Sequence, residues 1–137
     1  MLHALNDAAR AFLDGPHFAV LATVSPRGNP QQSVMWYLVE GDEILFNTKR
    51  GRVKEKNLAR NAEVSLCIAD GYRYITIRGV VRIIEDRDTT QADIERLAAR
   101  YTGPEKAAQR ARDQFNQEER ISYRVPLDQV TVYGFDE

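Results

Sequence analysis

With 137 residues, the chain has the usual length of one domain, and its 43% hydrophobic and 28% charged residues are typical of a soluble globular protein. Its 19 basic and 20 acidic residues give a formal net charge of -1, which argues against general nucleic-acid binding. The longest apolar runs are far shorter than the roughly 20 residues of a membrane-spanning helix, and the N-terminus has no secretory-signal pattern. We therefore expect one domain over residues 1–137, in the cytoplasm, with no membrane segment.

The first third of the chain predicts a short helix and an antiparallel meander. Asn6 or Asp7 is a suitable cap for a helix through Leu13, which Gly15-Pro16 ends. Turn residues then separate dense apolar runs, which predicts strands over the ranges His17–Val24, Gln31–Val39 and Glu43–Thr48.

The middle of the chain changes from a helical to a strand pattern. We expect a helix over Lys49–Arg60, a strand over Val64–Asp70 and one long strand over Tyr72–Glu85. Gly79 lies in the middle of that long strand, where a glycine permits a bulge or the close approach of another backbone at a barrel corner. The single cysteine, Cys67, lies within an apolar strand, so we expect a buried core thiol and no internal disulfide.

The last third predicts two helices and two closing strands. A helix from Asp88 or Thr89 to Tyr101 is separated by Gly103-Pro104 from a more polar helix that ends near Glu119. The strands are expected over Ile121–Val125 and Gln129–Phe135. The fold class is therefore mainly β (α+β), a six- to seven-stranded antiparallel barrel with short peripheral helices.

The densest charge lies in Lys49–Lys56, where five of eight residues are basic. This stretch begins where a strand ends and a helix is predicted to start, and a helix N-terminus with free N–H groups favours anions. Most helices carry acidic residues in the first turn, whereas this one is expected to be basic there. The stretch is interpreted either as a phosphate site with Thr48 and Gly51 or as a solvated basic face.

A second candidate lies on the strand Gln31–Tyr37, which carries amides, a hydroxyl and the only tryptophan. Trp36 fits either core packing or a ligand platform. The polar side chains of Gln32 and Ser33 are suited to hydrogen bonds with the ring atoms of a flat cofactor. The two histidines have no partner at metal-ligand spacing, and no nucleophile elbow, glycine-rich dinucleotide fingerprint or phosphate loop occurs. If the protein is an enzyme, a cofactor must supply the reactivity.

Several motifs, in order, resemble the pyridoxamine-5'-phosphate-oxidase-like superfamily. They are Phe18–Val24 followed by Gly28–Gln31, then Met35–Tyr37, Leu45–Thr48 with Arg52–Leu58, Val64–Leu66 and Arg78–Val81. The set is most similar to the flavin/deazaflavin oxidoreductase branch that uses coenzyme F-420. The resemblance covers roughly residues 10–102 and 125–134, whereas residues 102–119 show no close match.

The resemblance implies an FMN-binding split β-barrel that forms a homodimer, with cofactor sites at the subunit interface. It implies four groups of cofactor-binding residues. The residues beside the cofactor ring are Gln32, Ser33, Val34, Met35 and Trp36, and those along its ribityl chain are Asn47 and Thr48. The residues around its phosphate are Lys49, Arg50, Arg52, Lys54 and Asn57, and the partner chain contributes Tyr74 and Arg78.

The activity implied is hydride transfer between reduced coenzyme F-420 and a small conjugated organic acceptor, whose identity the sequence does not give. Such a reaction requires the protein chiefly to position its reactants and exclude water. One alternative is an FMN-dependent oxidoreductase on the same fold. Another is a non-catalytic flavin- or haem-binding protein, and a third is a polyanion-binding protein that uses Lys49–Lys56.

Overall fold

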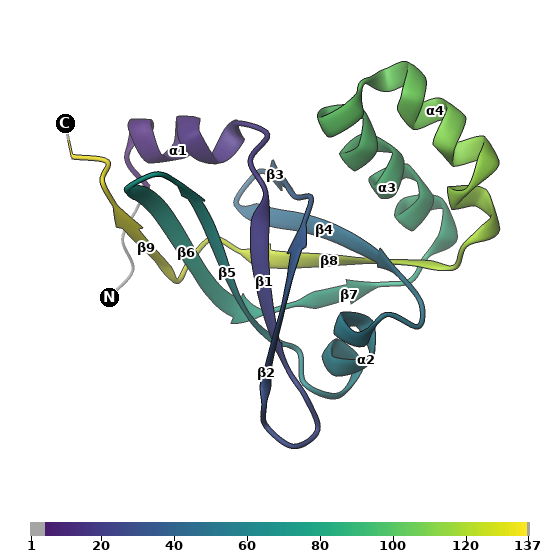
Figure 1. Cartoon of the computed structure of the whole chain (residues 1–137), viewed down its shortest axis with the longest axis horizontal. Coiled ribbons are helices and arrows are strands. Elements are labelled where there is room, and N and C mark those ends of the chain that lie inside the picture. Colours follow the sequence, from purple (N-terminus) through teal and green to yellow (C-terminus); the bar gives the residue numbers. More distant parts are fainter. Residues whose placement is uncertain (1–4, 137) are drawn as a thin grey trace.

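Two antiparallel sheets pack around one apolar core in the computed structural model, which describes residues 5–136 (Figure 1). The five-stranded sheet has the order β2 (Pro30–Met35), β1 (Ala19–Val24), β5 (Glu63–Asp70), β6 (Arg73–Val80) and β9 (Val130–Tyr133). The four-stranded sheet has the order β3 (Leu38–Glu40), β4 (Glu43–Lys49), β8 (Arg120–Pro126) and β7 (Arg82–Ile84). The architecture is that of a mainly β split barrel, as predicted.

The chain passes from one sheet to the other at two corners, and both divide a strand that was predicted to be continuous. The predicted strand Gln31–Val39 breaks between β2, which pairs with β1, and β3, which pairs with β4. The predicted strand Tyr72–Glu85 breaks between β6, which pairs with β5 and β9, and β7, which pairs with β8. At the second corner the Val81 N–H donates to the Ala62 carbonyl at 2.9 Å. Residues 5–136 therefore contain nine strands, more than the six or seven expected.

Strand alternation directs one face of each sheet into the shared core. Leu66 and Ile77 face inward from the first sheet, and Phe46 from the second is fully buried. Gly79 lies where β6 approaches β8, because a Cβ atom built there would come within 3.2 Å of Val125 Cγ1. The prediction of a bulge or of a close backbone was wrong at this glycine, because the strand register continues through Gly79 and the atom that approaches it belongs to a side chain.

The opposite face of the five-stranded sheet carries Cys67, which is half-buried rather than part of the core. Alternation along β5 turns Val64, Leu66 and Ile68 inward, so the residues between them face outward. The expectation of a buried core thiol was wrong, because the apolar run gives no indication of which of its residues face the core.

Four helices lie around the sheets: α1 (Asp7–Asp14), α2 (Val53–Arg60), α3 (Arg87–Thr102) and α4 (Pro104–Asp113). The Asn6 side chain caps α1 by accepting from the Ala9 N–H at 2.8 Å. Gly103, with a φ of +95°, separates α3 from α4, so the predicted break between these helices is confirmed. A 3-10 turn at Phe115–Gln117 then leads into β8.

The α3–α4 hairpin packs through a small apolar cluster of its own. Ile94, Leu97 and Phe115 are buried in this cluster, and Trp36 packs against them from the first sheet corner. A buried ion pair between Asp93 Oδ2 and Arg124 Nη1, at 3.2 Å, joins α3 to β8. These contacts place the hairpin beside β4 and β8 in Figure 1.

Candidate functional site

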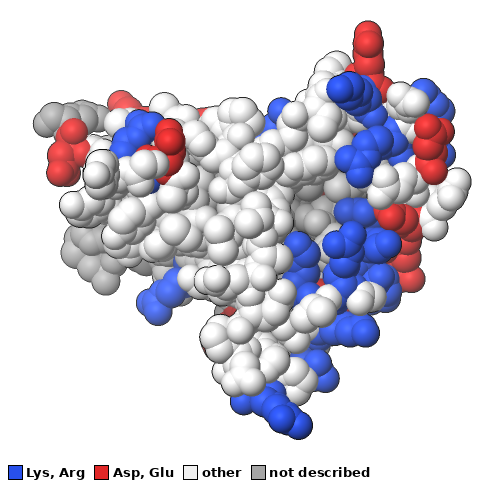
Figure 2. All heavy atoms as spheres, in the orientation of Figure 1, with Lys and Arg blue, Asp and Glu red and all other residues white. Residues whose placement is uncertain are grey.

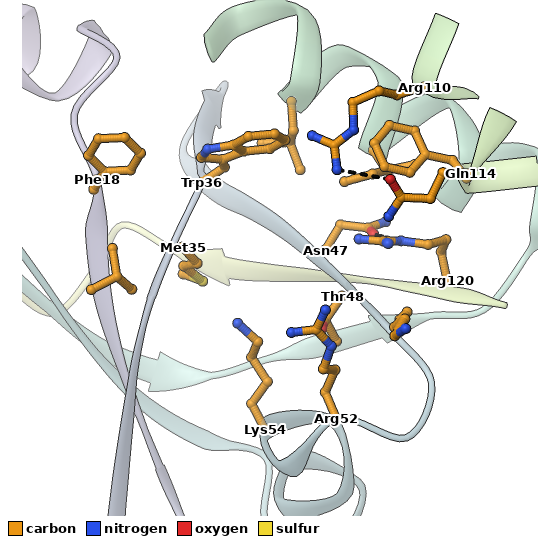
Figure 3. Close-up of a pocket in the computed structure, with 15 residues that line it drawn as sticks. Phe18, Met35, Trp36, Asn47, Thr48, Arg52, Lys54, Arg110, Gln114 and Arg120 are labelled. Atoms are coloured by element: carbon orange, nitrogen blue, oxygen red, sulfur yellow. Dashed lines mark hydrogen bonds between the residues drawn. The ribbon is translucent and has the colours of Figure 1, made fainter. Parts of the chain in front are cut away.

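An open cleft of about 320 Å³ lies between the first sheet corner, the start of α2 and the α3–α4 hairpin (Figure 3). Its lining includes five cations and no carboxylate. The lining residues are Phe18, Val34, Met35, Trp36, Asn47, Thr48, Lys49, Arg52, Lys54, Ile94, Leu97, Arg110, Gln114, Phe115 and Arg120. In Figure 2, Lys and Arg side chains gather around this hollow. The cleft is therefore a local basic site on a chain whose net charge is -1.

The start of α2 supplies one side of the cleft. Arg52 and Lys54 extend from it into the hollow (Figure 3), and Lys54 Nζ donates to Ser33 Oγ at 3.3 Å. Burial lowers the pKa of Lys54, and the positive charges of Arg52 and Arg120 lower it further. Within residues 5–136, neither Arg52 nor Lys54 has a carboxylate oxygen within ion-pair distance. This side of the cleft therefore offers two cations to an anion.

The helix that carries these cations begins later than predicted. It starts at Val53 rather than Lys49, since β4 continues through Lys49. Its first turn contains Glu55, a buried carboxylate that accepts from the Gly51 N–H at 2.8 Å. The prediction of a purely basic first turn was therefore wrong, and Glu55 occupies one of the donors that the sequence reasoning left free for an anion.

Two residues of the predicted phosphate segment lie outside the cleft. Arg50 pairs with Glu85 at 2.6 Å and Glu119 at 2.9 Å, and hydrogen bonds from its guanidinium to these carboxylates raise its pKa. Asn57 is buried and donates to Thr23 Oγ1 at 3.1 Å. Their side chains are engaged within the fold, so the structure does not bring them to the cleft with Arg52 and Lys54.

The first sheet corner supplies the apolar side of the cleft through Val34, Met35 and Trp36. The Trp36 ring stacks on Tyr101, with centroids 5.3 Å apart and planes 8° apart. Tyr101 is fixed in turn, because its hydroxyl donates to the His17 carbonyl and accepts from the Tyr37 N–H at 3.2 Å. The indole is thus held by its neighbour before any ligand binds.

The remaining predicted cofactor-binding residues of β2 and β4 differ in whether they reach the cleft. Ser33 contacts Lys54 at the edge of the cleft, whereas Gln32 is exposed on β2 and is not part of the lining. Asn47 and Thr48 line the cleft from β4, as does Lys49, whose Nζ lies 3.8 Å from Glu118 Oε2.

Sequence reasoning missed the wall formed by α3, α4 and the start of β8. Arg110 lies with its Cζ 5.0 Å from the centroid of the Phe115 ring and 5.8 Å from that of Trp36. Arg110 lies in the last turn of α4, and Gln114, four residues later, is the C-cap of that helix; this spacing is the signal that could have indicated them. Ile94 and Leu97 complete the wall from α3.

Arg120 is the second missed cation, and it is fixed by hydrogen bonds. Its Nε donates to Asn47 Oδ1 at 2.9 Å and its Nη1 to Glu118 Oε1 at 2.6 Å. Asn47 Nδ2 donates to Ser122 Oγ at 2.9 Å, so the network reaches β8. Burial lowers the pKa of Arg120, and Glu118 opposes that shift.

The two predicted partner-chain residues lie away from this chain's cleft. Tyr74 and Arg78 are on β6, on the face of the five-stranded sheet that points away from the core. Tyr74 stacks on Tyr133 with centroids 5.4 Å apart. Their contact with the cleft of a second chain stays a prediction.

No group of three or more His, Cys, Asp or Glu side chains within residues 5–136 is arranged to hold a metal ion. In the same part of the chain, no helix has the length and apolar character needed to cross a membrane.

The fold and the sequence are similar to those of known proteins. A conserved hypothetical protein from Mycobacterium tuberculosis superimposes with a TM-score of 0.82 at 26% identity, covering 98% of this chain and 87% of the other. An F-420 reductase has a TM-score of 0.71 at 30% identity, with 89% and 94% covered. A haem storage protein from Vibrio cholerae has a TM-score of 0.74 at 19% identity, with 97% of each chain covered, and shows the fold alone.

A search of curated proteins gave no match to this chain. The family model described as pyridoxamine 5'-phosphate oxidase matches residues 5–124, which is most of the chain and includes every residue that lines the cleft. The resemblance noted in the sequence is thereby confirmed: the chain belongs to the pyridoxamine 5'-phosphate oxidase family of split-barrel proteins.

Proposed function

We propose that the cleft binds the phosphate end of a flavin-type cofactor, coenzyme F-420 in preference to FMN, and that the protein is an oxidoreductase. One observation carries the proposal: Arg52 and Lys54 face an open cleft whose lining contains no carboxylate. A phosphate group is the natural occupant of such a site, because charge-assisted hydrogen bonds are stronger than neutral ones.

The neighbouring side chains fit the rest of such a cofactor. The buried hydroxyl of Thr48 and the Oδ1 of Asn47 lie beside the cations, where a polyol segment needs hydrogen-bond partners, whereas Asn47 Nδ2 already donates to the Thr90 carbonyl and to Ser122 Oγ. Val34 and Met35 offer apolar surface to a flat ring. A bound deazaflavin or flavin supplies hydride transfer to or from a small conjugated organic acceptor, and the chain's own residues position it and exclude water.

The preference for coenzyme F-420 rests on charge and on similarity. Lys49, Arg52, Lys54 and Arg120 together exceed what one phosphate monoester requires and suit the additional carboxylates of an oligoglutamate tail. An F-420 reductase is 30% identical over 89% of this chain. Haem is a weaker candidate, because Met35 is the only lining side chain of a type that commonly ligates haem iron.

We further propose that two chains form a homodimer through the outer face of the five-stranded sheet. Val80 is 60% exposed and Tyr133 59% exposed on that sheet. Phe18 and Val34, 57% and 66% exposed, belong both to this surface and to the cleft lining. A second chain packed there would bury apolar surface and close the open side of the cleft. In this proposal Tyr74 and Arg78, which lie on the same outer face, contact the partner's cofactor.

The decisive experiment is a side-by-side titration of the purified protein with coenzyme F-420, FMN and haem, followed by calorimetry and by absorbance. We expect the tightest binding for coenzyme F-420, then FMN. FMN binding as tight as or tighter than that of coenzyme F-420 would overturn the proposed preference for coenzyme F-420. Binding of haem but of neither flavin-type cofactor would overturn the proposal that the protein is an oxidoreductase. Light scattering should return twice the chain mass of 15.6 kDa, and a monomer at micromolar concentration would remove the shared site.

A further inference from the structure

The end of the cleft opposite α2 carries a separate cation, Arg110, next to two aromatic rings (Figure 3). We propose that Arg110, Trp36 and Phe115 form a subsite for a planar molecule that bears a carboxylate, and that this molecule is the hydride acceptor. The identification of this molecule as the hydride acceptor rests on the proposed function, whereas the subsite rests on the geometry of Arg110, Trp36 and Phe115.

Arg110 has unused hydrogen-bonding capacity. A guanidinium has five N–H donors, and the side-chain bond made by Arg110 within residues 5–136 goes from Nη2 to Gln114 Oε1 at 3.1 Å. Among the same residues, no carboxylate oxygen lies within ion-pair distance of it. Arg110 is held against the rings of Phe115 and Trp36 at 5.0 and 5.8 Å, so its position is restrained while most of its donors remain available.

Trp36 provides the flat surface beside this cation. Tyr101 stacks on the indole at an interplanar angle of 8°, and Trp36 also lines the cleft. Stacking on Tyr101 keeps the indole from rotating, so a planar conjugated ligand meets a surface that is already oriented. An acidic group on the edge of that ligand would then lie near Arg110.

A carboxylate fits Arg110 better than a second phosphate does. The planar fork of a guanidinium pairs with a carboxylate through two parallel hydrogen bonds, and one cation balances its single negative charge, whereas a phosphate carries more charge and suits the side of the cleft that gathers several cations from α2 and β4. Arg52 and Lys54 reach the cleft from α2, and Arg110 reaches it from α4, on the other side in Figure 3. The two sides can therefore hold two different anionic groups at once.

The test uses the only tryptophan of the chain, Trp36, as a fluorescent reporter of the cleft. The probe pair is anthraquinone-2-carboxylate and its neutral carboxamide, two planar molecules of the same shape. We expect Arg110→Gln to weaken carboxylate binding about tenfold or more and to leave carboxamide binding within about twofold. Arg112→Gln, on the same helix but exposed and outside the cleft lining, is the matched control and should change neither.

Two further titrations separate this proposal from the proposed function. Arg52→Gln should leave carboxylate-probe binding unchanged while it weakens FMN. If wild type bound the carboxylate probe through Arg110 but bound neither FMN nor coenzyme F-420, the proposed function would fall and the subsite would stand as a ligand site.

Other outcomes overturn the subsite. Equal loss of both probes in Arg110→Gln would show a packing role, and no loss would show that Arg110 is a solvated cation. Weaker binding of long-tailed coenzyme F-420 in Arg110→Gln, with unchanged FMN binding, would assign Arg110 to the cofactor tail. If Arg110→Gln unfolds, Arg110→Lys keeps the charge and removes the planar fork, and carboxylate binding equal to wild type in that variant would also refute the proposal.

Discussion

Replacing Lys54 by methionine should separate ligand binding from folding. The side chain is half-buried in the cleft, and no carboxylate among residues 5–136 lies within ion-pair distance of its ammonium. A charge-assisted hydrogen bond to an anion contributes about 1.5–3 kcal/mol, which corresponds to about tenfold to a hundredfold in the dissociation constant. We expect Lys54→Met to weaken FMN and coenzyme F-420 by the larger factor. Arg52→Gln should show the smaller one, because Arg52 is exposed and its charge is screened by solvent.

The stability of the unliganded protein should respond in the opposite direction. Burial and the charges of Arg52 and Arg120 lower the pKa of Lys54, so its charged form is held less favourably in the folded chain than in the unfolded one. Removing the charge should leave the melting temperature unchanged or raise it. Arg52 is the N-cap of α2 and makes no side-chain capping bond, so its replacement removes no cap either.

The assay is calorimetric titration with FMN and with riboflavin, which lacks the phosphate, next to thermal melts without ligand. Lys54→Met should remove the advantage of FMN over riboflavin. Lys56→Gln is the control, since Lys56 is exposed on α2 and outside the cleft lining. Dissociation constants within twofold of wild type in both cleft variants, together with lower melting temperatures, would show that these cations are structural and would refute the reasoning.

Three further predictions follow from other contacts. FMN affinity should fall as pH rises from neutral towards the ordinary lysine range, because the pKa of Lys54 is lowered and its ammonium loses its proton before that of an exposed lysine; titrations over that range should show the fall for wild type and a flat profile for Lys54→Met. Asp93→Asn removes the carboxylate charge 3.2 Å from the buried Arg124 and leaves Glu40, 3.7 Å away, as its ion-pair partner, so it should lower the free energy of unfolding by about 1.5–3 kcal/mol, measured by urea denaturation. Gly79→Val should cost about 1–3 kcal/mol in the same assay, because a Cβ there already lies 3.2 Å from Val125 Cγ1, and an unchanged midpoint would contradict the tight packing.

Much of the fold could be predicted because local signals agree with the tertiary structure. Asn6 caps α1, Gly103 separates α3 from α4, and the turn clusters delimit most strands. The first sheet corner, at Trp36, was not predicted, and the second lies at Val81, two residues after the corner expected at Gly79; the strand breaks were missed because alternation of apolar residues continues through Trp36 and Val81 while the pairing partner changes. A pattern of period two records which face is buried and contains nothing about the neighbouring strand.

The candidate site was predicted in part for a similar reason. Clustered cations in the sequence pointed to the start of α2, and Arg52 and Lys54 do line the cleft. The place of Arg50 depends on Glu85 and Glu119, which are 35 and 69 residues away in sequence and which draw its guanidinium to the other side of the strand end. No local window contains that information.

The positive charge of the cleft depends on ion pairs between residues that are far apart in the sequence. Glu85 and Glu119 pair with Arg50 outside the cleft, while the cations that line it come from β4, α2, α4 and β8. Within residues 5–136, Glu118 is the only carboxylate that forms ion pairs with these cations, and its partners are Lys49 and Arg120. A nearly neutral chain thus keeps a strongly positive hollow, because its carboxylates are sorted away from it. Clustered charges in the sequence indicate Lys49, Arg52 and Lys54. Arg110 joins them only because the α3–α4 hairpin packs beside β4 and β8, and it forms the second side of the cleft.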